Sequence, residues 1–358
     1  MAEIKGLSAH DRPPEVIRQR YKKYQRLPVS EVDADPGIIT LQDLDPDNLP
    51  DAISLAGWMS SKELRPAFER FLEQEDSSLQ HIGDLIDNIP IFTHRCVSGL
   101  RLIPSLFPPA VQAELLSRLF HRDLSNPIHQ TNVHLHYNMS YPHLSNTLDM
   151  GGYDALNGLQ STGHRASFFQ DDPTRVLSPK DPEAHKPITI QNFLDKKLRW
   201  ITLGGQYDWT AKQYPPGPPP PFPEDIARLL RAAFPETEAQ AAIVNVYSAG
   251  DTLSVHRDVS EECDVGLISV SFGCDGLFLV GHDTGDGCEI IRLRSGDAVY
   301  MTGRSRFAWH GVPKVLPETC PIWLKDWPVY QGGGAQYRHW RGWMAGRRIN
   351  LNVRQMVD

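Results

Sequence analysis

The sequence of 358 residues predicts a mainly β fold, a double-stranded β-helix (jelly roll) with flanking helices. Three observations support this prediction. From residue 242 onward, short apolar runs are separated by Gly and Asp, which is typical of short strands joined by turns. The last run, residues 348–354, alternates strictly between polar and apolar residues, so one face of this strand is suited to a ligand. Residues 125–225 are irregular and rich in His, Asn, Pro and Tyr, so we expect them outside the strand-rich core.

The first two segments of the chain are expected to flank this core. Residues 1–96 are rich in Pro and acidic residues and predict a partly irregular extension. Its basic run, residues 18–26, favours a solvated amphipathic helix. In the alternative, its tyrosines stack on bases while its cations meet phosphates. Residues 97–241 form the second segment, with a strand at 100–103 and a helix opened by Pro108 and Pro109.

The second segment ends in a proline run, and the third segment, residues 242–358, is the predicted jelly roll. Seven of the nine residues 215–223 are proline, so this stretch must be extended, and a short helix is expected at 226–234. Strands are then predicted at residues 242–247, 253–258, 265–272, 276–280, 288–293, 297–301, 307–312 and 348–354.

The composition limits the function classes and the compartment. The formal net charge is −8, so nucleic-acid binding would need a local basic patch, and tight binding to any long duplex is not expected. No apolar stretch is long enough for a membrane span, and the N-terminus lacks the hydrophobic region of a secretory signal. The five cysteines form no C-x-x-C pair, which indicates reduced thiols. We expect a cytoplasmic or nuclear protein, with a mitochondrial location as the alternative.

His256 and Asp258, followed by His310, form the most informative pattern in the chain. Residues i and i+2 of a strand point to the same side, so His256 and Asp258 can reach one ion. The second histidine must then come from a strand folded back alongside. Two imidazoles and one carboxylate on one face of a metal form the facial triad of non-haem Fe(II) oxygenases. An H-x-D pattern alone is short and frequent by chance, so the interpretation depends on what accompanies it.

The terminal strand supplies the second pattern. Arg348, Asn350, Asn352 and Arg354 would share one polar face, while the apolar residues between them face a core. Buried arginines and amides need partners, and a small dicarboxylate would match the guanidinium fork. Asn245 and Tyr247 repeat the i, i+2 spacing just before the H-x-D strand and can donate hydrogen bonds to the same acid. In the alternative, residues 348–354 are the solvated face of an edge strand.

In this order and spacing the chain resembles the AlkB-type 2-oxoglutarate/Fe(II) dioxygenases, most closely their first eukaryotic homologue subfamily. The resemblance covers about residues 97–358 and includes further stretches at 197–204 (KLRWITLG), 207–209 (YDW), 221–223 (PFP), 269–273 (SVSFG) and 305–307 (SRF). It implies a jelly-roll dioxygenase core preceded by a nucleotide-recognition lid within residues 97–241.

The resemblance also implies the chemistry. His256, Asp258 and His310 would hold Fe(II). Arg348 would pair with the distal carboxylate of 2-oxoglutarate, oriented by Asn245, Tyr247, Asn350 and Arg354. With O2 as oxidant and ascorbate as reductant, the enzyme would demethylate N1-methyladenine in RNA, especially tRNA, or a methyladenine in DNA, releasing formaldehyde, succinate and CO2. The expected partner is methylated, preferably unpaired, nucleic acid, and the expected state is a monomer.

Two positions depart from the family pattern. Asn352 stands where Thr is usual, and Ser260 stands where bacterial repair members carry an acidic residue that contacts the base. The second departure weakens the expectation of a bacterial type of repair specificity. Tyr207 and Trp209, in a polar, Pro-flanked segment, are either base-stacking residues of the lid or core residues. With Ser260, they are the candidate substrate contacts.

Two other functions stay open. The same oxygenase chemistry could act on a protein side chain such as a methylated histone lysine. A catalytically quiet nucleic-acid-binding module is disfavoured because every metal and co-substrate ligand is present. His134, His136 and His143 could form a second metal site, but structural or lid histidines are the favoured interpretation because no carboxylate or cysteine lies near them in the sequence.

Overall fold

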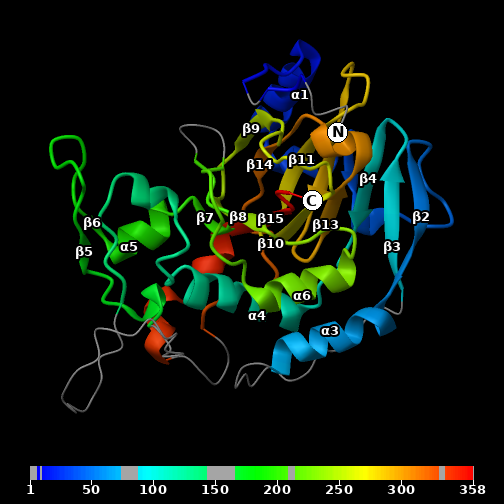
Figure 1. The fold of residues 1–358 in the computed structure, drawn as a ribbon. Coiled ribbons are helices and arrows are strands. Elements are labelled where there is room, and N and C mark those ends of the chain that lie inside the picture. The colour runs from blue at the N-terminus through cyan, green and yellow to red at the C-terminus, as the bar shows by residue number, and fades with distance from the viewer. Residues whose placement is uncertain are drawn as a thin grey trace, which may run out of the picture.

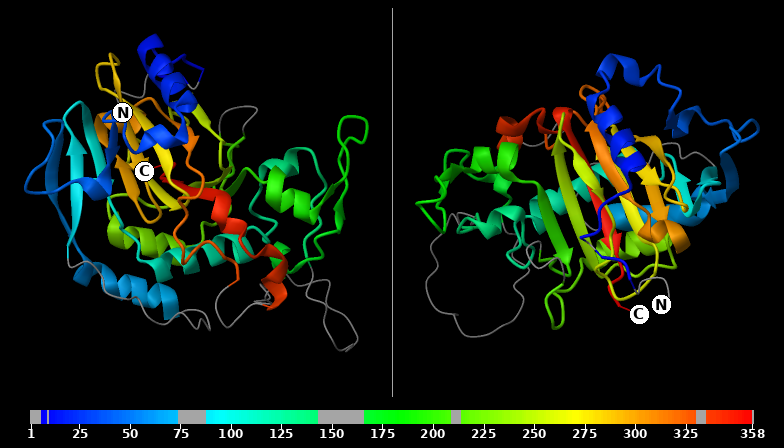
Figure 2. Two further views of the ribbon diagram at one scale, coloured as in Figure 1. Left: turned by 180° about the vertical axis from the view of Figure 1, so that it is seen from behind. Right: turned by 90° about the horizontal axis from the view of Figure 1, so that it is seen from above.

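The computed structural model describes residues 6–8, 10–73, 88–142, 166–208, 214–329 and 335–357. Two sheets stack on one another in these residues, as the predicted jelly roll requires, with helices on the outer faces (Figures 1 and 2). No helix among them is long and apolar enough to cross a membrane.

The larger sheet carries the terminal strand in its interior. Its order is β2 (Ile53–Ser60), β3 (Asn88–His94), β4 (Val97–Ile103), β13 (Ala298–Met301), β10 (Leu267–Gly273), β15 (Arg347–Arg354), β8 (Ala241–Ser248) and β7 (Trp200–Gly204). Strand β15 pairs with β10 on one side and β8 on the other, so it is not an edge strand and its polar face is not solvated. Tyr247 lies opposite Arg348, and Asn245 lies opposite Asn350.

The smaller sheet carries the H-x-D strand at its edge. Its order is β1 (Ile38–Thr40), β12 (Cys288–Leu293), β11 (Gly276–Gly281), β14 (His310–Val315) and β9 (Leu253–His256). Strand β14 runs antiparallel to β9, with His310 opposite His256. The prediction that the second histidine comes from a strand folded back alongside the first is therefore confirmed.

Three apolar clusters hold these layers together. Ile349, Leu351 and Val353 pack with the helices on the outer face of the larger sheet, as the alternation of β15 predicted. A second cluster lies between the sheets and includes Phe278 and Val299. The third lies on the outer face of the smaller sheet under α1. At roughly 25 cal/mol per Å² of apolar surface buried, these clusters supply most of the stabilisation of the fold.

The helices follow from their local sequences. They are α1 (Glu15–Arg26), α2 (Val29–Val32), α3 (Ser61–Glu73), α4 (Pro109–Ser117), α5 (Ile190–Asn192) and α6 (Glu224–Ala233). Helix α4 begins with a proline, whose missing N–H costs nothing there. Helix α6 has two acids in its first turn and buries Ile226, Leu229, Leu230 and Ala233, which share one helical face.

The predicted basic helix exists, and its tyrosines are not both exposed. In α1, Tyr24 is fully buried with Ile17 against the smaller sheet, and Tyr21 packs beside them. Burial of this kind favours the amphipathic-helix interpretation over base stacking by Tyr24.

A lobe formed by β5 (Val176–Leu177), β6 (Ile188–Thr189) and α5 projects away from the two sheets (Figure 1, left). Its strands are short and pair only with one another. The described residues of 125–225 are otherwise mostly loop and short helix, as expected, but β7 belongs to the larger sheet and so does not lie outside the strand-rich core.

Several predicted boundaries were wrong. The strand predicted at 253–258 ends at His256, and the strand predicted at 307–312 begins at His310, because Gly303–Phe307 form a 3-10 helix. Strands β1, β2 and β3, all within residues 1–96, were not predicted. Strand β1 pairs with β12 in the smaller sheet, and β2 and β3 extend the larger sheet beyond β4. The partner of β1 lies about 250 residues away in the sequence, so local pattern does not reveal it, whereas β3 pairs with the adjacent strand β4.

Candidate active site

His256, Asp258 and His310 converge at the edge where β9 and β14 pair. His256 is the last residue of β9 and His310 the first of β14. Asp258 lies two residues beyond the end of β9, so strand alternation does not orient it, contrary to the prediction. Its orientation depends instead on the polar contacts around it.

The three side chains are close enough to hold one ion. His256 Nε2 lies 3.6 Å from Asp258 Oδ1, and His310 Nε2 lies 3.8 Å from Asp258 Oδ2. One potential ligand atom from each residue lies within 4.8 Å of the other two. With metal–ligand bonds of about 2.0–2.2 Å, ligands of one ion stand ~3–4 Å apart, so small movements suffice.

Both imidazoles are fixed with Nε2 toward the centre. His256 Nδ1 donates a hydrogen bond to the Ser254 carbonyl at 2.8 Å, and His310 Nδ1 donates to the Ala308 carbonyl at 3.0 Å. These bonds set the tautomer and leave Nε2 as the ligand atom. His310 Nε2 is buried and has no hydrogen-bond partner.

The electrostatics suit a cation. Burial alone would raise the pKa of Asp258, but Arg354 and the two imidazoles hold this pKa well below its usual range. Burial lowers the pKa of His310 to about 4, with a smaller contribution from His256. An ionised carboxylate beside a neutral imidazole is the state that a metal ion binds.

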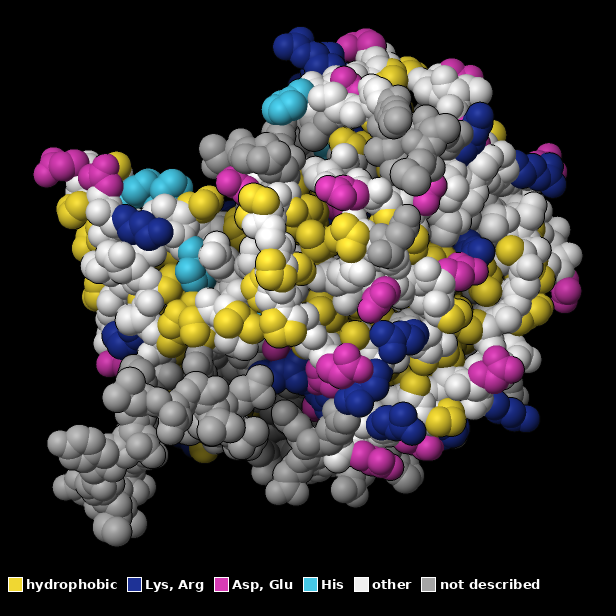
Figure 3. All heavy atoms as spheres, in the orientation of Figure 1, with side chains coloured by type: hydrophobic (Ala, Val, Ile, Leu, Met, Phe, Trp, Pro, Cys, Tyr) yellow, Lys and Arg dark blue, Asp and Glu magenta, His cyan; other side chains and the backbone are white. Residues whose placement is uncertain are grey.

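A cavity of about 230 Å³ opens beside these residues. It is lined by Tyr207, Ile243, Asn245, Leu253, Ser254, His256, Arg257, Asp258, Ser260, Glu261, Asn352 and Arg354. On the face shown in Figure 3, hydrophobic side chains form a broad band above a region of mixed Lys, Arg, Asp and Glu over the helices.

Arg348 is buried without a charged partner. It is 1% exposed, donates from Nη2 to Ser271 Oγ at 2.9 Å, and has no hydrogen-bond partner for Nε or Nη1. The Tyr247 hydroxyl is also buried without a partner, and its ring centroid lies 5.5 Å from Arg348 Cζ. Burial lowers the pKa of Arg348, although it remains a cation. Such unpartnered donors are costly unless an anion satisfies them.

Gly276 makes room for this arginine. A Cβ added at Gly276 would lie 2.5 Å from Arg348 Nε, closer than any real contact. The glycine at the start of β11 is therefore required by the path of the Arg348 side chain.

The other predicted co-substrate residues lie, like Arg348 and Tyr247, on the paired strands β8 and β15. Asn245 lines the cavity, and the side-chain amide of Asn350 donates to Ser269 Oγ at 2.8 Å and to the Val270 carbonyl at 3.1 Å. Arg354 Nη2 donates to Asp258 Oδ2 at 2.7 Å, so in this structure it contacts a carboxylate of the triad. Asn352, where the family has Thr, also lines the cavity.

Tyr207 and Ser260, two of the predicted substrate contacts, both line the cavity. The Tyr207 hydroxyl lies 3.3 Å from Ser260 Oγ, and the Tyr207 ring stands edge-on to Tyr214 at 5.3 Å. Trp209, the third, lies outside the described residues.

Sequence reasoning assigned no role to Glu261 and Arg306. Both are buried, and Arg306 Nη2 donates to Glu261 Oε2 at 2.8 Å. A sequence does not distinguish a buried ion pair from two exposed charges. The signals were that Glu261 follows Ser260 and that Arg306 belongs to the stretch 305–307, which matches the family pattern and lies just before His310.

The histidines considered for a second metal site have other contacts. His134 Nε2 lies 2.7 Å from the Tyr141 hydroxyl, and the ring of His136 lies 4.4 Å from that of His185. His134 is in a 3-10 helix, so the two histidines do not lie on one face of a strand. His143 lies outside the described residues. This supports the structural interpretation of His134 and His136.

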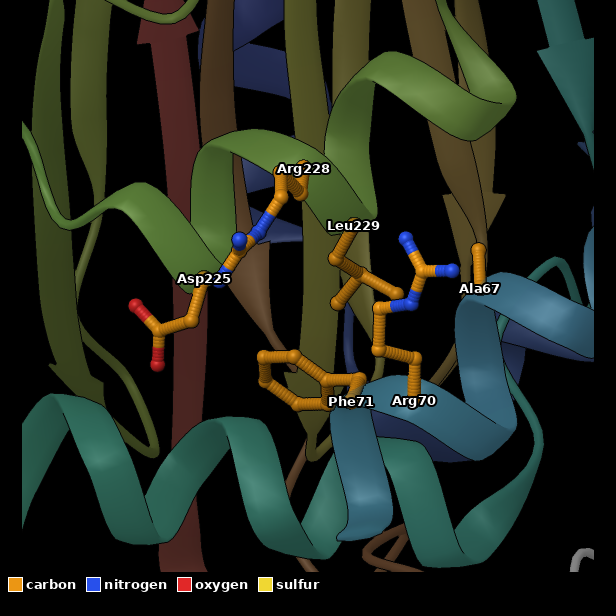
Figure 4. Close-up of a pocket in the computed structure, with 6 residues that line it drawn as sticks. All are labelled: Ala67, Arg70, Phe71, Asp225, Arg228 and Leu229. Atoms are coloured by element: carbon orange, nitrogen blue, oxygen red, sulfur yellow. The ribbon is translucent and has the colours of Figure 1, made fainter. Parts of the chain in front are cut away.

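A second, smaller hollow of about 50 Å³ lies between α3 and α6 (Figure 4). Arg70 and Arg228 line it together with Asp225, whose carboxylate is already bridged by Arg118 at 2.6 Å. Because the Asp225 carboxylate is already paired, we interpret this hollow as a gap in the ion-pair network between packed helices.

Comparison of the sequence with known protein families agrees with this geometry. The family model described as the 2OG-Fe(II) oxygenase superfamily matches residues 171–354, and the chain belongs to this superfamily. It is therefore a dioxygenase that uses Fe(II), 2-oxoglutarate and O2. The triad offers the donor set that iron takes, and the unpartnered donors of Arg348 and Tyr247 fit a carboxylate of 2-oxoglutarate.

The relatives confirm the resemblance to the first eukaryotic AlkB homologue subfamily. The chain is 44% identical over 368 residues to "N6-methyladenosine RNA demethylase ALKB1" of Pyricularia oryzae, covering 98% of each protein. It is 50% identical over 242 residues to "N6-methyladenosine RNA demethylase ALKBH" of Cryphonectria parasitica, covering 63% of this chain and 100% of that one. It is 33% identical over 301 residues to "tRNA demethylase abh1" of Schizosaccharomyces pombe, covering 81% of this chain and 90% of that one.

Proposed function

We propose that this dioxygenase oxidatively demethylates N-methylated adenine in unpaired RNA or DNA, releasing formaldehyde, succinate and CO2. The observation that carries the proposal is one cavity lined by His256 and Asp258 of the triad, by Asn352 and Arg354 of β15, and by Tyr207. The names of the three relatives support methyladenine in RNA or tRNA as the substrate class.

In this proposal, His256, Asp258 and His310 hold Fe(II) through their inward-facing atoms. The unpartnered Nε and Nη1 of Arg348 and the Tyr247 hydroxyl receive the distal carboxylate of 2-oxoglutarate. Asn245, Asn350 and Arg354 orient the co-substrate from the same wall. The three residues of β15 are held in register by its two neighbours, so the co-substrate site is preorganised.

Bound Fe(II) and 2-oxoglutarate supply the activation of O2, and the chain's own residues determine which C–H bond is presented. One oxygen atom goes to the carboxylate of succinate, and CO2 leaves. The other is inserted into an N-methyl C–H bond. The resulting hemiaminal breaks its C–N bond to give formaldehyde and the unmethylated base. Burial of His310 and Arg348 keeps water away from that side of the site, whereas the His256 side chain is 34% exposed toward the cavity.

Tyr207 and Ser260 are the proposed contacts to the base. An aromatic ring at the cavity wall can stack on a base of any sequence, typically for about 1–3 kcal/mol. A base in a duplex would first have to leave the stack at a cost of a few kcal/mol, so unpaired targets are favoured. We extend the same role to Trp209.

We further propose that ascorbate keeps the iron reduced and that the chain acts as a monomer. Size-exclusion chromatography with light scattering measures the mass directly, and omission of ascorbate tests the reductant.

Mass spectrometry of nucleosides and peptides tests the proposal. The protein is incubated with Fe(II), 2-oxoglutarate and ascorbate together with single-stranded and duplex oligonucleotides containing N1- or N6-methyladenine. We expect the methylated nucleoside to be lost faster from the single strand. If only a methyl-lysine histone peptide is consumed, the substrate is a protein and this proposal is wrong.

A further inference from the structure

Glu261 is a buried carboxylate shared by two buried arginines next to the metal triad. Its side chain is 3% exposed, and those of Arg306 and Arg354 are 1% and 5% exposed. Arg306 Nη2 lies 2.8 Å from Oε2 of Glu261, and Arg354 Nε lies 3.2 Å from Oε1. If Glu261 were neutral, each of these arginines would lose a buried charged partner.

Each of these arginines also holds Asp258. Arg354 Nη2 donates to the carboxylate oxygen Oδ2 at 2.7 Å, and Arg306 Nη1 donates to the backbone carbonyl of Asp258 at 2.8 Å. Arg306 further donates from Nε to the Val265 carbonyl at 3.1 Å, which ties the other end of the same loop. Glu261 therefore lies at the centre of the contacts that fix Asp258.

Asp258 needs such contacts because it lies beyond the end of β9. The two histidines are held by paired strands and by hydrogen bonds to backbone carbonyls, whereas Asp258 has no pairing partner in the sheet. We propose that Glu261 is a positioning residue, which orients the Asp258 carboxylate for the metal through Arg354 and Arg306. This inference rests on the proposed role of Asp258 as a metal ligand.

The charges explain how the positioning works. Each guanidinium group contacts both acidic residues. Arg354 contacts the carboxylates of Glu261 and Asp258, and Arg306 contacts the carboxylate of Glu261 and the backbone carbonyl of Asp258. Without the charge of Glu261, Arg354 would turn its full charge to Asp258 and compete with a metal for that carboxylate. Glu261 thus keeps Arg354 from neutralising the metal ligand. Tyr214, 3.5 Å from Glu261 through its hydroxyl, connects the same network to the segment that carries Tyr207.

Metal affinity measured without turnover tests the inference. Mn(II) alone is titrated into the metal-free full-length protein, and free Mn(II) is followed by electron paramagnetic resonance. In Glu261→Gln, which keeps the shape and removes the charge, we expect the Kd for Mn(II) to rise roughly 10–100-fold, as for other residues that orient metal ligands. Thermal unfolding of each variant checks that it is folded.

Glu114→Gln is the matched control. Glu114 is also a buried carboxylate, paired with the buried Arg118 at 2.7 Å, but it lies in α4 and does not line the cavity beside the triad. It should lower thermal stability and leave the Kd for Mn(II) unchanged. A folded Glu261→Gln protein with wild-type Mn(II) affinity would overturn the inference, as would an equal loss of affinity in Glu114→Gln.

Arg306→Lys is the second variant if Glu261→Gln does not fold. A lysine keeps the positive charge but cannot reach both Glu261 and the Asp258 carbonyl with a planar fork, so Mn(II) affinity should again fall. Unchanged affinity would contradict the proposal. Failure of the proposed function looks different, because the wild-type protein itself would then bind no Mn(II) at the triad and Asp258→Ala would change nothing.

Discussion

The cavity has a sheet wall, formed by Ile243, Asn245, Asn352 and Arg354, and a loop wall, formed by Tyr207, Ser260 and Glu261. Residues of the sheet wall come from β8 and β15, which are paired along their whole length. Residues of the loop wall come from segments without strand pairing, and they are held by side-chain contacts to one another.

This difference separates two tasks. Binding a metal ion and a small dicarboxylate requires side chains in fixed positions, and paired strands hold side chains in this way. Binding a nucleobase that enters from solvent requires side chains that can adjust their positions, and loops carry such side chains. We therefore expect substitutions near the sheet wall to change metal and co-substrate binding, and substitutions of Tyr207 and Ser260 in the loop wall to change nucleic-acid binding. Glu261 is the exception in the loop wall, because its contacts with Arg306 and Arg354 connect it to Asp258.

The largest effect is expected at the triad. His256→Ala and Asp258→Ala should each abolish turnover and weaken Fe(II) or Mn(II) binding, because each removes one of three protein ligands. Succinate production and metal titration measure the two effects. His339→Ala, which removes an exposed histidine that does not line the cavity, is the control. Wild-type succinate production by either triad variant would rule out the assignment.

A smaller but specific effect is expected at Arg348. Arg348→Ala should raise the KM for 2-oxoglutarate, with a loss of about 2–5 kcal/mol if the buried pair forms. Arg348→Lys should restore this only in part, because the bidentate geometry is lost. Affinity for a methylated oligonucleotide should change little, since the residue belongs to the strand that forms the sheet wall. An unchanged KM in Arg348→Ala would remove this residue from the co-substrate site.

In the loop wall, Tyr207→Ala should weaken binding of a methylated single strand by about 1–3 kcal/mol. Tyr207→Phe keeps the ring and should retain most of the affinity. Fluorescence anisotropy gives the affinities, and thermal unfolding is the control for a role in the core. The same pair of measurements on Trp209→Ala decides between lid and core for that residue. A variant that melts far below wild type while its folded fraction binds RNA normally belongs to the core.

The smallest effect is expected at Gly276. A methyl group there would collide with Arg348 Nε, so Gly276→Ala should raise the KM for 2-oxoglutarate less than Arg348→Ala does. Overpacking should also cost about 1–3 kcal/mol of stability. Gly346→Ala is the matched control, since its Cβ would meet no atom within 4 Å and its φ is not in the left-handed region. Equal KM values for the two glycine variants would show that Gly276 does not shape the co-substrate site.

The sequence predicted the sheet wall well and the loop wall only in part. Strict alternation in residues 348–354 placed Arg348 and Asn350 on one face, because a strand has a fixed period of two. The same reasoning placed Asp258 on a strand that in fact ends at His256. What orients Asp258 is a set of contacts with Arg306 and Arg354, which lie 48 and 96 residues away in the chain. No local pattern carries that information.

The pairing of strand β1 was missed for the same reason. Strand β1 pairs with β12 in parallel, and Ile38 lies opposite Ile290. A three-residue strand has too little periodicity to identify, and the partner cannot be inferred from neighbouring residues. Helix α1, by contrast, was predictable because its apolar positions repeat at helical spacing.

The most direct test of the account is the coupling between co-substrate and substrate in one reaction. A single-stranded oligonucleotide with one methylated adenine is incubated with the protein, Fe(II) and 2-oxoglutarate, and succinate, formaldehyde and the methylated nucleoside are quantified together. We expect equal amounts of formaldehyde formed and methyladenine lost, a matching amount of succinate above the substrate-free rate, and none of these products with His256→Ala. Succinate formation with no loss of methyladenine, N1 or N6, would contradict this expectation.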